Sequence, residues 1–318
     1  MRHQAETSTF RQVIGAILIA AFVAMFASCT NETVSYAIDS EELILTNGAD
    51  VRSTKASSSD ILVKAYTFDA NTSAAAKSYF TDLYTQSGSL YISNTSKFWP
   101  ESMYVSANSR LSVFAVTPST ITLNDASYLT ASSNNLPTFS YTVALNAAAQ
   151  EDVKVAKTVA QSVESQVVLN MNSVLSTINV NLKGAQAGQG TTVYTINSVT
   201  IRGAYADGEY DFNSSRMQIA ENAETQDFIL PVSTEWTNRE VSADDTFAAA
   251  SEYAFHMIPQ SATEIVVDYT VEYNGYVIFR GTQVEQLNGF WSQNKTYNYD
   301  IELNHGGERI DYNPFVAE

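Results

Sequence analysis

The chain has 318 residues, with 17 basic and 34 acidic side chains, and a formal net charge of −17 at pH 7. A protein this acidic is repelled by nucleic acid and by anionic lipid headgroups. Composition therefore predicts neither of them as a direct partner. A single cysteine excludes an internal disulfide, and stability must therefore come from burial. Tyr, Phe, Val, Ile and Thr are plentiful while Lys and Arg are sparse, which favours an all-β protein. The length suits two domains.

Near the N-terminus, an uncharged apolar run covers Val13–Phe26 and ends in the small residues Ala27 and Ser28, directly before Cys29. A basic start, a short apolar run and small residues at its end are typical of a secretory signal peptide. The run is short for a permanent membrane span. The cysteine position resembles a bacterial lipobox, although Phe26 stands where Leu is usual. We therefore predict a lipoprotein signal peptide over 1–28 and lipidation of Cys29; an ordinary signal peptide with an accidental cysteine is the alternative.

A polar segment follows the predicted anchor and contains one apolar alternation, Leu43 and Leu45, before the turn signal Asn47-Gly48. We expect this alternation to pair as a short strand. Arg52 then lies among small and polar residues, where flexible chain is cut most easily by a protease. We treat 29–52 as a propeptide with an N-terminal strand and tether. Cleavage after Arg52 and a mobile tether are equally compatible with these residues.

The next strands are read from period-2 patterns. Asp60–Phe68 is apolar on much of both faces, Arg110–Thr117 is a strong strand closed by Pro118, and Asn274-Gly275 marks the clearest hairpin. We also expect a hairpin at Asp207-Gly208, and a short helix or a loop over Ala74–Tyr84. Further strands are expected at Leu90–Ser93, Phe139–Ala144, Val167–Leu169, Val174–Leu182 and Thr296–Leu303.

Short strands with regular turn signals are typical of β-sandwiches. The composition turns to Ala, Gln, Lys and Val between Leu145 and Gln166, and we place a domain junction near the end of this stretch. The predicted domains are 53–165 and 166–318. Within them we expect five aromatic residues to be largely buried: Trp99, Phe114, Tyr269, Trp291 and Tyr299.

Several motifs, taken in this order, resemble the fimbrillin family of type V pilus subunits. The Cys29 lipobox and the Arg52 segment are two of these motifs. The others are Phe98-Trp99-Pro100 before Leu111–Pro118, Asp152–Ala156, Val167–Val180, Met257-Ile258-Pro259-Gln260, and Phe290-Trp291 through Lys295-Thr296-Tyr297. Asn294 replaces a usual Gly, and a residue near Asn172 replaces a frequent His. The resemblance covers nearly the whole chain.

The resemblance implies two tandem transthyretin-like β-sandwich domains and a surface-exposed lipoprotein of the outer membrane that enters a fimbrium. It also implies cleavage after Arg52, loss of an N-terminal strand, and filling of the resulting groove by a C-terminal strand of another pilus subunit. This is β-augmentation, in which ladder hydrogen bonds give affinity and side-chain pockets give specificity.

The C-terminal tail contains the candidate donor residues Ile310, Tyr312 and Phe315. Ile310 and Tyr312 alternate, so that one face can enter a groove. Pro314 limits how far such a strand can run. The tail folding back on its own domain is the rival interpretation.

We find no catalytic constellation in the sequence. His256 and His305 are separated and no second cysteine accompanies them, so no zinc spacing is present, and no Gly-x-Ser-x-Gly elbow occurs. We expect no enzyme activity, no cofactor and no metal. The membrane is expected to be a partner through the lipid anchor alone. Two other functions stay open: a non-polymerising surface lipoprotein that binds glycans or host ligands, and a secreted hydrolase with an unrecognised site.

Overall fold

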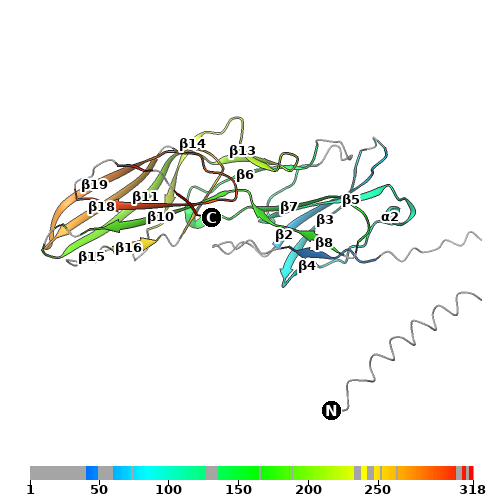
Figure 1. The fold of residues 1–318 in the computed structure, drawn as a ribbon, viewed down its shortest axis with the longest axis horizontal. Helices are drawn as coiled ribbons and strands as arrows, with labels where there is room; N and C mark the ends of the chain where they lie inside the picture. Colours follow the sequence, from blue (N-terminus) through cyan, green and yellow to red (C-terminus); the bar gives the residue numbers. More distant parts are fainter. Residues whose placement is uncertain are drawn as a thin grey trace, which may run out of the picture. The chain divides into compact units, whose positions relative to one another are not determined.

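The computed structural model divides the chain into two units, Met1–Asp39 and Ser40–Glu318. It describes residues 41–48, 60–72, 75–125, 135–164, 166–185, 187, 189–232, 238–241, 247–250, 253–262, 264–305, 310–312 and 315–317. All of these lie in the second unit, which Figure 1 shows as a ribbon coloured along the sequence. Cys29 and Arg52 fall outside the described residues.

The N-terminal half of the second unit forms one sheet of eight strands, with β1 in second place from one edge. The order is β8-β1-β4-β3-β2-β5-β7-β9. The strands are β1 (Leu45–Asn47), β2 (Asp60–Asp69), β3 (Lys77–Ser87), β4 (Leu90–Ser93), β5 (Ser109–Thr117), β7 (Lys154–Gln161), β8 (Val167–Leu169) and β9 (Asn172–Ser173). A short helix, α2 (Ser102–Val105), precedes β5.

Three further sheets complete the unit, and they confirm that the fold is all-β. One runs β16-β10-β20-β22 with β17 also paired to β10, one runs β14-β11-β18-β19-β21 with β15 also paired to β11, and one runs β13-β12-β6. Their strands are β6 (Thr138–Thr142), β10 (Ser176–Gly184), β11 (Thr192–Tyr205), β12 (Asp207–Asp211), β13 (Arg216–Ile219), β14 (Thr225–Leu230), β15 (Arg239–Val241), β16 (Phe247–Ala250), β17 (Phe255–Met257), β18 (Glu264–Tyr273), β19 (Tyr276–Leu287), β20 (Thr296–Leu303), β21 (Ile310–Tyr312) and β22 (Phe315–Ala317), with a 3-10 turn η1 at Ala147–Ala149.

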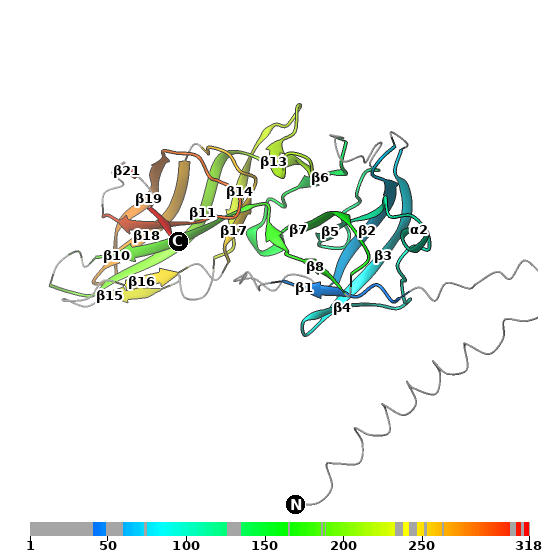
Figure 2. The same cartoon turned by 45° about the vertical axis from the view of Figure 1, so that its right-hand side comes forward.

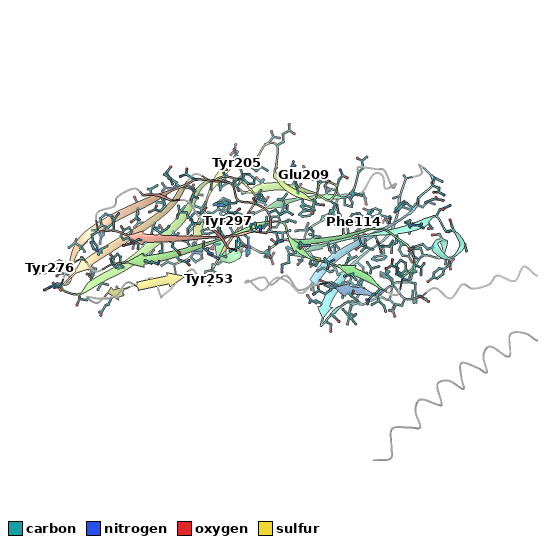
Figure 3. All side chains as sticks on the ribbon, viewed as in Figure 1. Phe114, Tyr205, Glu209, Tyr253, Tyr276 and Tyr297 are labelled. Carbon is teal, nitrogen blue, oxygen red and sulfur yellow. The ribbon has the colours of Figure 1, made fainter. Side chains whose placement is uncertain are left out.

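The eight-stranded sheet is apolar on both faces, as the pattern of β2 predicts. Ile61, Val63 and Ala65 enter one buried cluster, which also holds Leu43, Leu45 and Trp99. Phe114 and other residues of the opposite face enter a second cluster, where the Phe114 ring lies edge-on to Phe212 with centroids 5.2 Å apart. Figure 3 places Phe114 on the ribbon of this sheet. Because β5 is buried on both faces, it reads as a nearly continuous apolar run.

The five aromatic residues expected in the core are confirmed there. Their exposed fractions are 1% for Trp99, 0% for Phe114 and Tyr269, 2% for Trp291 and 1% for Tyr299. The Trp291 indole also donates to the Tyr299 hydroxyl across 2.9 Å. Aromatic burial of this kind gives the core its largest contacts per residue.

The predicted hairpin at Asn274-Gly275 is present between β18 and β19. Asn274 and Gly275 both have positive φ, 49° and 80°, which a two-residue hairpin turn requires and which Asn and Gly adopt most readily. Tyr276, the first residue after the turn, lies at the end of this hairpin (Figure 3).

The prediction of a hairpin at Asp207-Gly208 is wrong. Both residues lie inside β12, which pairs with β6 and β13, whereas β11 pairs with β14, β15 and β18. Gly208 is required here for close packing, because a Cβ at this position would lie 2.8 Å from Ile258 Cδ1 and 3.0 Å from Met217 Sδ. Glycine inside a strand can mark such a close approach as well as a turn.

The prediction of a helix or loop over Ala74–Tyr84 is also wrong, because β3 covers Lys77–Ser87. The alanines precede the strand, and the strand itself is rich in Tyr, Phe and Thr, which favour β structure. Only Tyr84 is fully buried in β3, so its period-2 pattern is weak. Composition averaged over the whole stretch therefore concealed the strand.

Strands on either side of residue 165 share sheets in the described structure. β8 pairs with β1, β9 pairs with β7, and β6 pairs with β12. One buried cluster also joins residues from both sides, such as Val155 and Val174. The division into 53–165 and 166–318 stays a prediction.

Candidate functional site at the N-terminal strand

β1 lies between two other strands rather than at a sheet edge. Leu45 is opposite Tyr91 of β4, which runs antiparallel, and opposite Val167 of β8, which runs parallel. Figure 2 shows β1 beside β4 and β8. The strand expected from Leu43 and Leu45 is therefore confirmed, and it has ladder partners on both sides.

Backbone hydrogen bonds extend this pairing over residues 41–48. On the β4 side, the Leu43 amide donates to the Lys97 carbonyl at 2.7 Å, and the Trp99 amide donates to the Glu41 carbonyl at 2.9 Å. On the β8 side, the Val167 amide donates to the Ile44 carbonyl at 2.8 Å. The segment is thus bonded along both flanks. We call the space it occupies, between the chain from Ser89 to Trp99 and β8, the slot.

The inner face of the segment fills the core of the eight-stranded sheet. Leu43 is 4% exposed and Leu45 is 1% exposed, and both belong to the cluster that contains Trp99, Val167 and Leu169. Full burial of a leucine side chain is worth about 1.5–3 kcal/mol. Two such side chains and the backbone ladder therefore anchor the segment in the slot.

A carboxylate stabilises the loop that forms one wall of the slot. Asp82 of β3 accepts hydrogen bonds from the Ser93 and Thr95 hydroxyls, at 2.6 and 2.8 Å, and its Oδ2 lies 2.7 Å from Lys97 Nζ. Burial raises the pKa of Asp82, but the bonds from Lys97, Ser93 and Thr95 outweigh it and hold the pKa well below its usual range. Asp82 therefore fixes the loop whose Lys97 carbonyl receives the Leu43 amide.

Two of the predicted site residues cannot be placed. Cys29 lies in the first unit, and Arg52 lies in the stretch 49–59 that connects β1 to β2; both are outside the described residues. Lipidation of Cys29 and cleavage after Arg52 stay predictions. The connection that holds Arg52 begins directly after Gly48, at the end of the slot.

The predicted donor residues belong to strands that pair within this chain. Ile310 and Tyr312 lie in β21, which pairs in parallel with Glu285–Leu287 of β19. Phe315 lies in β22, which pairs antiparallel with Thr296–Asn298 of β20. This is the pairing expected if the tail folds back, and the donor role stays a prediction.

Sequence reasoning missed the part that β8 plays in the site. Val167–Leu169 was expected to be a strand, but its pairing with β1 joins residues about 120 positions apart and leaves no local signal in the sequence. The sequence indicated only that Val167 and Leu169 are apolar, and the structure shows both of them buried.

The described residues contain no group of three His, Cys, Asp or Glu side chains that could hold a metal ion. His256 is 1% exposed, and its backbone amide donates to Gln150 Oε1 at 2.7 Å. His305 follows β20 and its Nε2 lies 3.0 Å from the Ala185 carbonyl oxygen. Within the same part of the chain, we find no helix with the length and apolar character needed to cross a bilayer.

A family model described as fimbrillin-like matches residues 49–313. The chain belongs to the fimbrillin-like family. The matched range begins just after the slot segment and covers the strands from β2 to β21. Among curated proteins, none matches this fimbrillin-like chain.

Several solved structures are similar to this chain. A protein from Bacteroides uniformis assigned to cell adhesion has a TM-score of 0.54 at 12% identity, covering 83% of this chain and 93% of its own. One from Bacteroides ovatus with the same assignment has a TM-score of 0.49 at 12% identity, covering 89% and 97%. A fimbrial assembly protein from Parabacteroides distasonis has a TM-score of 0.38 at 14% identity, covering 82% and 89%. The first of these supports the fold of the fimbrillin-like chain.

Proposed function

We propose that this chain is a structural or accessory subunit of a cell-surface pilus, assembled by strand exchange after proteolytic removal of its N-terminal strand. Family membership supports a pilus-type subunit. The observation that carries the exchange mechanism is the position of β1, which is paired on both sides and inserts Leu43 and Leu45 into the core. Arg52, the proposed cleavage point, lies in the connection from β1 to β2.

The physics of the slot favours exchange over simple loss of the segment. After cleavage, residues up to 52 are held by the ladder and by apolar burial alone. If the segment leaves, the backbone groups of β4 and β8 lose their partners and two leucine-sized spaces open into the core, which is costly. An incoming strand with apolar residues at alternate positions restores both. Such an open slot must also be protected before assembly, and the uncut segment does this.

The proposed donor is the C-terminal tail of a neighbouring subunit, identical or homologous. β21 and β22 each cover three residues and pair with β19 and β20 of their own chain. Donation requires a tail to give up these short ladders for the slot of a neighbour. Short ladders are the least costly ones to exchange, because few hydrogen bonds and little apolar area are lost.

We further propose a surface location at the outer membrane, with the lipid on Cys29 as the only membrane contact and no role for nucleic acid. The role proposed is structural, without catalysis, cofactor or metal. For the alternative of glycan binding, Trp99 and Trp291 are 1% and 2% exposed and cannot act as sugar-stacking platforms, while Trp236 lies outside the described residues.

The test is assembly of protease-treated protein into ladders that resist mild denaturant. Wild-type protein should form them after trypsin-like cleavage, and Arg52→Ala together with Lys55→Ala should prevent them. Deletion of residues 306–318 should also prevent them while leaving cleavage intact. Ladders that persist after both changes would exclude strand exchange and leave a tethered surface module. The same deletion followed by thermal unfolding provides the control for loss of fold.

A further inference from the structure

The side of β1 that faces away from the core is also enclosed. Filling the core alone does not require this second face to be covered. Thr46 lies opposite Leu90 of β4 and opposite Val168 of β8. It points away from the core that receives Leu45, because successive side chains of a strand alternate. Even so, Thr46 is only 8% exposed. Its hydroxyl donates to the Val167 carbonyl at 3.5 Å.

The residues around Thr46 form an aliphatic strip on this outer face, made of Ile44, Leu90, Ile92 and Val168. Their exposed fractions are 41%, 41%, 53% and 42%. Alternation assigns all of them to the outer face, because Leu43, Leu45, Tyr91, Val167 and Leu169 enter the inner cluster. The strip therefore flanks the slot on both sides, and Thr46 is covered between Leu90 and Val168.

We propose that the slot selects its incoming strand on both faces and that the position of Thr46 demands an uncharged, β-branched residue. This inference rests on the strand exchange proposed above. Cross-strand pairs of β-branched and aliphatic side chains are favourable. A carboxylate at the Thr46 position would lie between the aliphatic side chains of Leu90 and Val168, which is unfavourable for a charge.

This requirement discriminates between the two strands of the C-terminal tail. If Ile310 takes the position of Leu45, Asp311 takes the position of Thr46 and places a carboxylate there. If Tyr312 takes the position of Leu45, Pro314 takes the position of Asn47. The Asn47 amide donates to the Ser89 carbonyl at 2.8 Å, and proline has no amide hydrogen. The first register of Ile310–Tyr312 therefore buries a carboxylate, and the second fills both core positions but loses the ladder bond of the Asn47 amide.

One register of Phe315–Ala317 meets the requirement at Thr46 and keeps the Asn47 ladder bond. With Ala317 at the position of Leu45, Glu318 would occupy that of Thr46, which is again a carboxylate. With Phe315 at the position of Leu45, Val316 occupies that of Thr46, and valine has nearly the shape of threonine. Pro314 then takes the position of Ile44, where the bonded group is the carbonyl that accepts from Val167. Asn313 takes the position of Leu43, so in this register Phe315 alone restores apolar burial in the core. The occupant we assign to the slot is therefore Phe315–Ala317 of a second copy of this chain.

The experiment measures displacement of the cleaved N-terminal fragment. The full chain is produced without lipidation and kept in detergent. It is labelled with a dye on the free thiol of Cys29, its only cysteine, and cut after Arg52. Synthetic peptides of residues 41–48, 308–313 and 313–318 are then added, and release of the labelled fragment is followed. The 41–48 and 313–318 peptides should displace it, whereas 308–313 should not.

Matched peptides isolate the outer position. Thr46→Val in the 41–48 peptide should preserve displacement, whereas Thr46→Asp there and Val316→Asp in the 313–318 peptide should weaken it about tenfold or more. Failure of every peptide, the unchanged 41–48 peptide included, would reject strand exchange itself. Equal displacement by the Thr46→Asp and unchanged 41–48 peptides would leave exchange standing and overturn the two-faced selection. Stronger displacement by 308–313 than by 313–318 would overturn the assigned occupant.

Discussion

Lys97 is joined to Asp82 and to Leu43 at the same time. Its ammonium lies 2.7 Å from Asp82 Oδ2, while its carbonyl accepts the Leu43 amide at 2.7 Å. One residue thus connects a carboxylate of β3 to the segment that fills the slot. The arrangement links the protonation of Asp82 to the wall against which the N-terminal segment pairs.

We predict that Asp82→Asn lowers the urea midpoint at pH 7. Because the folded-state pKa of Asp82 is depressed, its stabilising contribution is fully present above the ordinary carboxyl value of about 3.9 and is lost as pH falls below that value. The difference between wild type and Asp82→Asn should therefore shrink below about pH 4. Asp227→Asn is the control, because that side chain is 59% exposed and lies 3.8 Å from Arg202. A difference that persists unchanged to pH 2.5 would contradict the assignment.

We predict that Trp99→Ala lowers the free energy of unfolding by about 3–5 kcal/mol, as expected for truncation of a fully buried Trp. The neighbouring Phe98 supplies a matched control, because it is 46% exposed while Trp99 is 1% exposed. Phe98→Ala should change the free energy of unfolding by about 0.5 kcal/mol or less. Equal losses for the two variants, measured by chemical denaturation, would show that this motif is not core.

Gly208→Ala should destabilise the protein by about 1–3 kcal/mol through overpacking. The added Cβ would lie 2.8 Å from Ile258 Cδ1. Ile258→Val removes that methyl group, so the double variant should lose less stability than the sum of the two single variants. Strictly additive losses in a double-mutant cycle would mean that Ile258 does not limit the space at Gly208.

Cys29→Ala should abolish incorporation of a labelled fatty acid and leave an unprocessed precursor. The reason is the apolar run that ends in Ala27-Ser28 directly before the sole cysteine. Metabolic labelling followed by mass spectrometry of the mature N-terminus gives the measurement. Label of equal intensity in wild type and variant would contradict lipidation at this residue.

Local patterns predicted the elements whose side chains alternate strongly. β2 and β20 follow from period-2 burial, and the hairpin between β18 and β19 follows from Asn274-Gly275. The strand at Leu45 was predictable for the same reason, because Leu43 and Leu45 face the core together.

The rest depends on contacts that local sequence does not encode. Gly208 has the local sequence of a turn, yet it lies in β12, which pairs with β6 and β13, and Ile258 and Met217 approach it closely there. The second wall of the slot comes from β8, far along the chain from β1. The burial of Thr46 results from Leu90 and Val168, which are themselves exposed, so no hydropathy pattern of residues 41–48 predicts it.

The dependence of β8 on β1 has a consequence beyond the slot. Among the described strands, β1 is the only ladder partner of β8, and the chain passes from β7 through β8 to β9 and on to β10. Between β7 and β8, the Thr158 hydroxyl donates a hydrogen bond to the Val168 carbonyl at 3.1 Å. The N-terminal segment therefore stabilises the stretch that leads from β7 to β10. The Val167 amide donates to the Ile44 carbonyl. Hydrogen exchange at this amide would therefore report whether the slot holds a strand, without a probe on either strand.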